Sequence, residues 1–432
     1  MSFGNKNIGQ FFGIFSMVFF SWIHYMALRD VRDAFVVCNG GGAGMILPLK
    51  TVSYLFTCLA AIPILLLSRG GDVSKVLKIY FPLNALLLGG CSCLSFANSS
   101  LLSNPLFIKG FYLFSGASMV LSPALVWGCA NQRYTFKKAA MLYPIIQLLC
   151  ATLSTSVFVA FFHFSAQVAS QNPFRAQAIL LAIVATINLL ALAVYRQMDR
   201  NCTDADVQEN ESKRPSMYFI VLGTMASIFI FLPDLMRCLF TCELRKMIPN
   251  VGDYNTFLSN HSASIKEWKF YAGIASCLIG VVLYFVGPKG FFSSVGLIGF
   301  GMLISGIIFL HGAKTKTIDQ ENLLSYVLFI SLISIVDIFR ELAYFGINQQ
   351  HRFHAKIIAE VIVYSLSYPI SWLLIGGIQV YGIVLQVVEP IVIIGAIVSL
   401  GGLYYVHQKL NEKRQLSALP IDRICLEPVQ NL

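Results

Sequence analysis

The stretch NQRYTFKKA, residues 131–139, recurs in altered form as NQQHRFHAK, residues 348–356. Asn, Gln and Phe keep the same offsets in the two copies, which begin 217 residues apart, about half of the 432-residue chain. The first copy follows the fourth long apolar run of the sequence, and the second follows the tenth. This spacing predicts two halves built on one plan.

The composition places both copies in a membrane protein. Hydrophobic residues make up 56% of the chain, charged residues only 12%, and the mean hydropathy is +0.71. A water-soluble chain carries about 25% charged residues. Apolar runs of roughly 20 residues, long enough to cross a bilayer, recur about twelve times. The expected spans are 8–28, 46–67, 77–97, 106–130, 139–163, 174–195, 217–240, 268–287, 290–311, 323–345, 355–379 and 382–407.

The fold that we expect is all-α: a polytopic membrane protein with about twelve transmembrane helices in two six-helix halves, on the major-facilitator plan. Long polar breaks follow the sixth and the seventh runs, and the first of them separates the halves. The expected parts are an N-terminal six-helix bundle over residues 1–196 and a C-terminal six-helix bundle over residues 217–408. A cytoplasmic linker over residues 197–216 joins them, and a cytoplasmic tail follows over residues 409–432.

The basic residues give the expected orientation. One set of connections holds many of them, among them Arg69, Lys75, Arg133 and Arg200, whereas opposite connections such as NSSLLSNP carry almost none. We therefore expect both termini and the linker in the cytoplasm. Much of the formal net charge of +10 is then a topology signal, and no nucleic-acid partner is expected.

Motifs for metal, cofactor or catalytic chemistry are absent from the sequence. The eleven cysteines lie mostly inside apolar runs and form neither CxxC nor a Cys/His cluster, which indicates neither a metal site nor a disulfide framework. There is no GxxxxGK[ST], HExxH or GxSxG, and GGGAG at 40–44 reads as a turn between spans. We expect no enzyme, no catalytic residue and no cofactor.

Three basic residues near the start of the chain predict an anion site. Arg29 and Arg32 close the first apolar run in LRDVRD, and Lys50 lies more than one turn inside the second, with no acid nearby in sequence. A charge at the centre of a membrane helix costs about 2.5–3.5 kcal/mol, so it is a functional candidate by default. Arg binds phosphate bidentately and Lys as a point charge, which suits a polyphosphate. Tyr25 is a candidate for stacking on a base.

Further charges lie in or near the later spans, several of them at helical spacing. Arg237 stands three residues after Asp234, Arg340 and Glu341 follow Asp337, and Lys356 stands four before Glu360. Such spacing stacks opposite charges on one helix face. These groups therefore have two interpretations: substrate contacts, or ion pairs that staple the bundle together or control its gating.

Four stretches, in order along the chain, carry a resemblance to a known family: YMALRDVRDAFVV with ILPLK, LVWGCANQRYTFKKAAMLYPI, LRKMIPNVGDYNTFLSNHS and RELAYFGINQQHRFHAK. They resemble the ATP/ADP translocases of plastids and obligate intracellular bacteria. The resemblance implies a major-facilitator fold, nucleotide exchange and a bacterial inner-membrane location. By position, Arg29, Lys50 and Lys356 match basic residues of the family, Arg32 stands where it has Lys, and Arg340 with Glu341 matches its R-E pair.

The sequence also departs from that family. Ser115 or Gly116 replaces an acid of the fourth span, and Arg237 aligns best with an acid of the seventh. Two lost acids and one gained base indicate altered selectivity or coupling.

The expected function is a nucleotide transporter, for ATP/ADP exchange or a related nucleotide, working by alternating access between the two halves. The expected substrate-binding residues are Tyr25, Arg29, Arg32, Lys50, Arg237, Arg340, Glu341 and Lys356. One alternative is a carrier of another organic anion, such as a dinucleotide, a nucleotide sugar or a phosphorylated metabolite. A second alternative is a membrane scaffold that transports nothing. The expected partners are the anionic substrate and the lipid bilayer.

Overall fold

The computed structural model describes residues 5–39, 46–68, 73–97, 104–169, 173–201, 251–287, 340–347 and 349–363, with short stretches and single positions between 221 and 409. Side chains at the two ends of α1, at the starts of α2 and α6, and in parts of α5 and α8 lie outside this description. Every regular element in the described part is helical, as the apolar runs predict.

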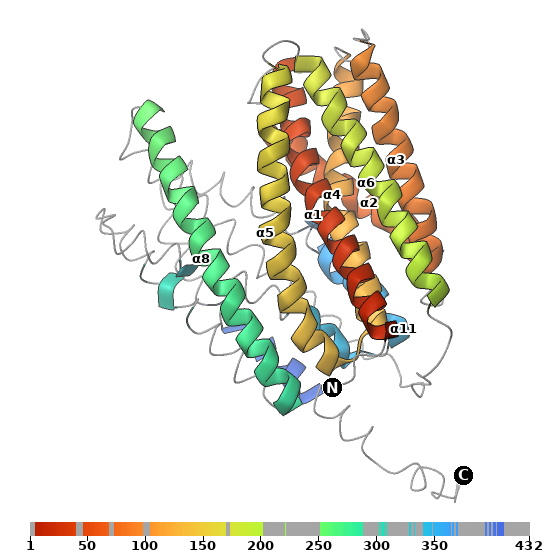
Figure 1. Cartoon of the computed structure of the whole chain (residues 1–432), viewed down its shortest axis with the longest axis vertical. Helices are drawn as coiled ribbons and strands as arrows, with labels where there is room; N and C mark the ends of the chain where they lie inside the picture. Colours follow the sequence, from red (N-terminus) through yellow and green to blue (C-terminus); the bar gives the residue numbers. More distant parts are fainter. Residues whose placement is uncertain are drawn as a thin grey trace, which may run out of the picture.

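Six long helices form the N-terminal half (Figure 1): α1 (Asn5–Asn39), α2 (Ile46–Leu67), α3 (Val73–Phe96), α4 (Pro105–Arg133), α5 (Phe136–Ala169) and α6 (Pro173–Asn201). Helix α1 packs on α4, α5 and α6, while α2 packs on α4 and α3 packs on α6. The core of the bundle is therefore α1 and α4, with the other helices around them.

Local sequence determines where α4 begins and ends. The Asn104 side chain accepts a hydrogen bond from the Leu106 N–H at 2.9 Å, and Pro105 stands at the first helical position, where its missing N–H costs nothing. At the other end, Tyr134 is extended and its N–H donates to the Ala130 carbonyl at 3.2 Å. Helix α5 begins again at Phe136, so α4 and α5 are joined by a tight connection.

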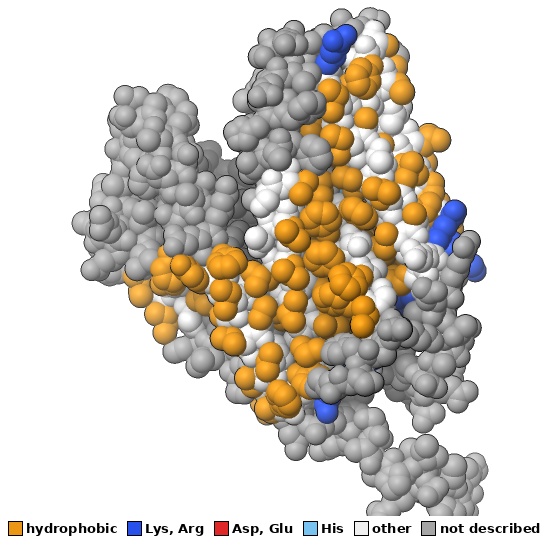
Figure 2. Space-filling view, in the orientation of Figure 1, with side chains coloured by type: hydrophobic (Ala, Val, Ile, Leu, Met, Phe, Trp, Pro, Cys, Tyr) orange, Lys and Arg blue, Asp and Glu red, His pale blue; other side chains and the backbone are white. Residues whose placement is uncertain are grey.

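The surface of the described helices is that of a membrane protein. Six helices are long and apolar enough to cross a bilayer, within α1 to α6. Large apolar side chains are exposed along α2, α3, α6 and α8, for example Leu59, Leu86, Leu189 and Phe285. In Figure 2 such side chains cover the middle of the visible surface, while Lys and Arg side chains lie towards its margins. The hydrocarbon interior of a bilayer matches this distribution.

The described part of the C-terminal half lies against this bundle. It consists of α8 (Val251–Val286), a helical turn at residues 340–343, the 3₁₀ turn η4 (Tyr344–Gly346), α11 (Gln349–Lys356) and the π-helical η5 (Ile357–Val363). Helix α8 runs beside α5, and α11 packs on α4 at the end of the bundle where the N-terminus lies (Figure 1). Segment η5 contacts both α2 and α4.

Small residues allow the close packing of α8 on α5. A Cβ atom on Gly280 would stand 2.3 Å from the Ala140 carbonyl oxygen, and one on Gly273 would stand 2.6 Å from a Leu148 methyl group. Only glycine permits the backbones to approach this closely, as at other membrane helix interfaces.

The predicted spans agree with the described helices in position, but two expectations are corrected. The polar stretch after the seventh run was expected to be a connection, yet α8 already begins at Val251, because hydropathy marks what lies in lipid and not where a helix starts. The two copies of the repeated motif do not occupy the same place relative to the helix ends, and differ by about one turn. Asn131 and Gln132 lie in the last turn of α4, whereas Gln349 begins α11. The two copies nevertheless meet, since the Gln349 side chain donates to the Gln132 carbonyl.

Candidate functional site

The basic residues of the first two spans lie where α1, α2 and α4 meet. Arg32 is only 6% exposed, and its guanidinium carbon lies 4.4 Å from the ring centroid of the fully buried Tyr112 on α4. Stacking on an aromatic face suits Arg better than Lys, because the guanidinium is planar and weakly hydrated. The positive charge of Arg32 is thus held at a defined place inside the bundle.

Gly116 brings α2 into this junction. A Cβ atom on Gly116 would stand 1.9 Å from Ser53 Oγ and 3.5 Å from a terminal nitrogen of Arg32. Lys50 is half-buried and lies three residues before Ser53, on nearly the same face of α2. Arg32 and Lys50 therefore belong to one junction, to which Ser53 adds a hydroxyl group. We call Arg32, Lys50, Ser53 and Tyr112 the basic junction.

The other residues predicted for this site have different surroundings. Arg29 is exposed, one turn before Arg32 on α1. Tyr25 is half-buried, packs on the apolar cluster that contains Tyr112, and stands edge-on to Trp22 with ring centroids 6.4 Å apart. Arg237 lies outside the described residues, as does the side chain of Asp33.

A neutral polar network joins four helices further along the bundle. His24 on α1 bonds Ser118 Oγ on α4 at 2.9 Å through Nε2, and Asn188 on α6 at 3.1 Å through Nδ1. Asn84 on α3 exchanges two hydrogen bonds with Ser118, at 2.7 and 3.0 Å, and donates to Asn188 at 3.3 Å. All four residues are almost completely buried. Since the Asn188 amide donates to Nδ1, the proton of His24 is assigned to Nε2.

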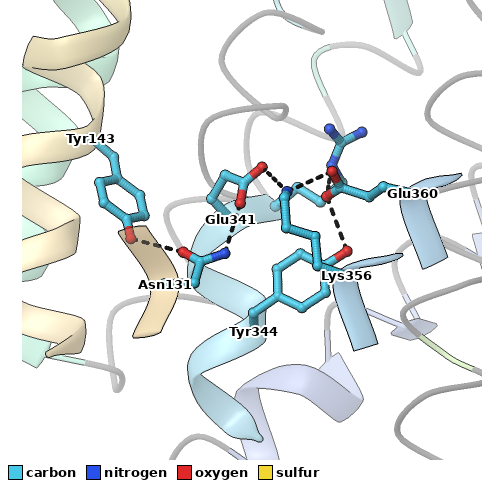
Figure 3. A network of polar contacts seen from close by, with 7 residues as sticks. Asn131, Tyr143, Glu341, Tyr344, Lys356 and Glu360 are labelled. Carbon is cyan, nitrogen blue, oxygen red and sulfur yellow. Dashed lines mark hydrogen bonds and ion pairs between the residues drawn. The ribbon is translucent and has the colours of Figure 1, made fainter. Parts of the chain in front are cut away.

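A charged network joins the two halves at the end of the bundle where α11 lies (Figure 3). Lys356 is fully buried, and its ammonium group contacts Glu341 Oε1 and Glu360 Oε2, each at 2.5 Å. Arg340 forms an ion pair with Glu360 at 3.2 Å, and the Tyr344 hydroxyl donates to Glu360 at 3.0 Å. All of these residues belong to the C-terminal half.

The N-terminal half contributes neutral groups to the same network. The Asn131 side-chain amide on α4 donates to Glu341 Oε2 at 2.9 Å, and the Tyr143 hydroxyl on α5 donates to Asn131 Oδ1 at 2.8 Å (Figure 3). Arg352 donates to the Asn131 carbonyl at 3.0 Å. We call these residues, with those of the preceding paragraph, the inter-half network.

Sequence reasoning found one part of these sites and missed another. The pairing of Lys356 with Glu360 is confirmed, and Arg340, Glu341 and Lys356 come together. Glu341 and Lys356 contact each other, and they lie far from the basic junction. On α4, Tyr112 of the basic junction and Asn131 of the inter-half network are 19 residues apart, which corresponds to roughly 28 Å. Asn131, Ser118 and Asn188 were missed. For Ser118 and Asn188 the available signal was a neutral hydroxyl or amide inside an apolar run, which also occurs at positions without a role, and for Asn131 it was the repeated motif that this residue begins.

In the part of the chain that the structure describes, no group of three or more His, Cys, Asp or Glu side chains is arranged to hold a metal ion. Neither the known protein-family models nor the curated proteins match this sequence.

Solved structures do match the fold. The xylose:proton symporter XylE, a major facilitator superfamily protein, has a TM-score of 0.64 at 13% identity, over 94% of this chain and 96% of that one. FucP, a major facilitator superfamily transporter in the outward conformation, has a TM-score of 0.60 at 12% identity, over 91% and 98%. This chain has the major facilitator fold. A bacterial homologue of the iron transporter ferroportin, in an outward-facing state, matches this chain at a TM-score of 0.58 and 14% identity, over 94% and 99%.

Proposed function

We propose that this major facilitator carries nucleotides, or closely related organic phosphates, across the membrane by alternating access between its two halves. The observation that carries the proposal is the burial of Arg32 at the junction of α1, α2 and α4. A guanidinium group inside a membrane bundle is costly, and a protein retains it where it recognises an anion or holds another buried charge. The neighbouring Lys50 and Ser53 favour the anion.

The chemistry of the basic junction fits a phosphate chain. Arg32 and Arg29 present planar donors that bind phosphate oxygens in pairs, and Lys50 adds a mobile point charge from the neighbouring helix. Tyr25 stands one turn before Arg29 on α1, in reach of a ligand held by that arginine. We assign Arg29, Arg32 and Lys50 to the phosphates and Tyr25 to the base. Arg237 remains a candidate phosphate contact of the C-terminal half.

The first experiment measures thermal unfolding of the purified full-length protein with a panel of anions. The panel holds ATP, ADP, a dinucleotide, a nucleotide sugar, a sugar phosphate and inorganic phosphate. A ligand present at 100 times its Kd stabilises the folded state by about 2.7 kcal/mol, which is readily detected as a rise in Tm. We expect ATP or ADP to give the largest rise.

Two variants show whether the basic junction is responsible. Arg32→Gln removes the buried guanidinium and should abolish the rise in Tm. Lys109→Gln removes one positive charge from the exposed face of α4, the helix that carries Tyr112 of the basic junction, and should leave the rise intact. A rise in Tm only with a dinucleotide or a sugar phosphate would indicate that this anion, and not ATP or ADP, is the substrate. No rise with any anion would contradict the proposal and favour a scaffold.

A further inference from the structure

Ser53 on α2 carries the hydroxyl group of the basic junction and is only 3% exposed. In the described part of the chain, this hydroxyl makes no hydrogen bond. Buried hydroxyls nearby bond carbonyls of their own helix: Thr57 donates to the Ser53 carbonyl at 2.8 Å, and Ser115 to the Tyr112 carbonyl at 3.0 Å. A buried hydroxyl without such a bond is unfavourable unless water or a ligand bonds it, so Ser53 points to a group from outside the chain.

Gly116 on α4 determines where this hydroxyl lies. A Cβ atom on Gly116 would stand 1.9 Å from Ser53 Oγ and 3.1 Å from Ser53 Cβ. The hydroxyl therefore occupies the space that a side chain at position 116 would take. The same point lies 3.5 Å from a terminal nitrogen of Arg32. The hydroxyl and the guanidinium thus lie close enough for one phosphate group to bond both of them.

The exposure of the polar groups falls towards Ser53. Arg29 is exposed and Lys50 is half-buried, whereas Arg32 is 6% exposed and Ser53 only 3%. At Ser53, α2 and α4 are in direct contact, because Gly116 places no side chain between them. A chain of phosphates that comes in past Arg29 and Lys50 would therefore end at Ser53.

The group at the end of such a chain is a terminal phosphate. It offers three strong acceptor oxygens and carries more negative charge than a phosphate that is esterified on both sides. The planar fork of Arg32 suits two of these oxygens, and the Ser53 hydroxyl can donate to the third. A phosphate capped by a sugar or by a second nucleoside has one oxygen fewer, and it carries a bulky group where α2 and α4 touch.

We propose that Ser53 and Arg32 together bind the terminal phosphate of the substrate, and that Gly116 makes room for the Ser53 hydroxyl. The inference rests on the proposed function and narrows it: the carrier takes nucleotides that end in a free phosphate, and it excludes dinucleotides and nucleotide sugars. Ser53 and Gly116 determine this specificity, while Arg29 and Lys50 supply positive charge to the inner phosphates.

Equilibrium binding of ADP and of ADP-glucose to the purified full-length protein tests this assignment, because the two ligands differ only in the glucose that caps the terminal phosphate. For the wild-type protein, we expect ADP to bind at least about tenfold more tightly than ADP-glucose. Ser53→Ala removes only the hydroxyl and should weaken ADP binding by about tenfold, which corresponds to one lost hydrogen bond to a charged group. The affinity for ADP-glucose should stay unchanged.

Gly116→Ala is an independent variant, because its methyl group takes the place of the Ser53 hydroxyl. It should weaken ADP binding about as much as Ser53→Ala does. The double variant should show no further loss, since both changes remove the same contact. Ser95→Ala is the matched control, because Ser95 on α3 is as deeply buried and its hydroxyl bonds the Cys91 carbonyl of its own helix at 2.9 Å. This control should bind both ligands as the wild-type protein does.

The outcomes separate this inference from the proposed function. If Ser53→Ala weakens both ligands equally, or weakens neither, the terminal-phosphate assignment is overturned while the protein still binds nucleotides. A wild-type protein that binds ADP-glucose as tightly as ADP overturns the assignment in the same way. A wild-type protein that binds neither ligand overturns the proposed nucleotide carrier, and the inference with it.

Discussion

Ser118 lies at the centre of the polar network that joins α1, α3, α4 and α6 of the N-terminal half. Its hydroxyl accepts from His24 and Asn84 and donates back to Asn84, and its carbonyl accepts from the Tyr80 hydroxyl at 3.1 Å. In the hydrocarbon interior of the bilayer, no water is available to replace a hydrogen-bond partner that one of these groups loses. The network therefore makes α1, α3, α4 and α6 one rigid unit, which suits a half that moves as a body.

Substitution of Ser118 should be costly for this reason. Ser118→Ala leaves the His24 N–H without a partner and removes both hydrogen bonds that Asn84 exchanges with Ser118, and we expect the free energy of unfolding to fall by about 1–3 kcal/mol. Ser156→Ala is the matched control, because the Ser156 hydroxyl bonds only within its own helix and the residue is exposed. Chemical denaturation in detergent measures both variants. Equal stability of the two would contradict the role of Ser118.

At the same scale, the sequence identified charged residues better than neutral ones. Arg32 and Lys50 could be recognised because a charge inside an apolar run is rare and expensive. Ser118 could not, and the partner of Asn131 could not be predicted although this residue begins the repeated motif, since neutral polar residues are common in membrane helices and the partners of the two lie 94 and 210 residues away in sequence. Only the fold shows which of them meet.

Among the elements, α5 and α8 form a close contact between the halves. Gly280 lies against the Ala140 carbonyl and the Pro144 ring, so the helix backbones nearly touch. Gly280→Ala places a methyl group 2.3 Å from a backbone oxygen, and one helix must shift. We expect a loss of about 1–3 kcal/mol in unfolding free energy, as for other overpacked contacts.

Gly90→Ala is the control for this contact, because a Cβ atom on Gly90 of α3 meets nothing within 4 Å. Alanine favours a helix over glycine by about 1 kcal/mol, so this variant should be neutral or slightly more stable. Thermal unfolding monitored by circular dichroism compares the two variants. A Gly280→Ala protein as stable as wild type would show that α5 and α8 pack less tightly than described.

The elements themselves were largely predictable, and their ends were not. The predicted span 46–67 coincides with α2, because glycine-rich stretches bound the apolar run on both sides, GGGAG at 40–44 and RGGD at 69–72. Helix α1 was expected to leave the membrane at residue 28 but continues to Asn39, so that Arg32 is presented from a helix and not from a loop. Hydropathy gives the lipid-embedded part of a helix, and helical hydrogen bonding extends beyond it.

At the scale of the whole molecule, the apolar surface determines the membrane class and the fold, while a few buried polar sites remain for function. The apolar runs predicted the membrane class and, together with the division of the chain into two halves, the major facilitator fold, which the solved structures confirm. The substrate could not be predicted in the same way, because the fold does not determine what a carrier binds. We propose that in this chain it depends on a few side chains at the basic junction, with the inter-half network lying roughly 28 Å further along α4.

Counterflow of labelled nucleotide in proteoliposomes tests the central claim most directly, namely that the buried Arg32 holds an anion that the protein carries. Vesicles preloaded with unlabelled nucleotide should accumulate labelled ATP or ADP through the wild-type protein and the Lys109→Gln variant. Through Arg32→Gln, uptake should fall by at least about tenfold, corresponding to the loss of one charge-assisted contact. Full uptake through Arg32→Gln, with folding and insertion unchanged, would contradict the account.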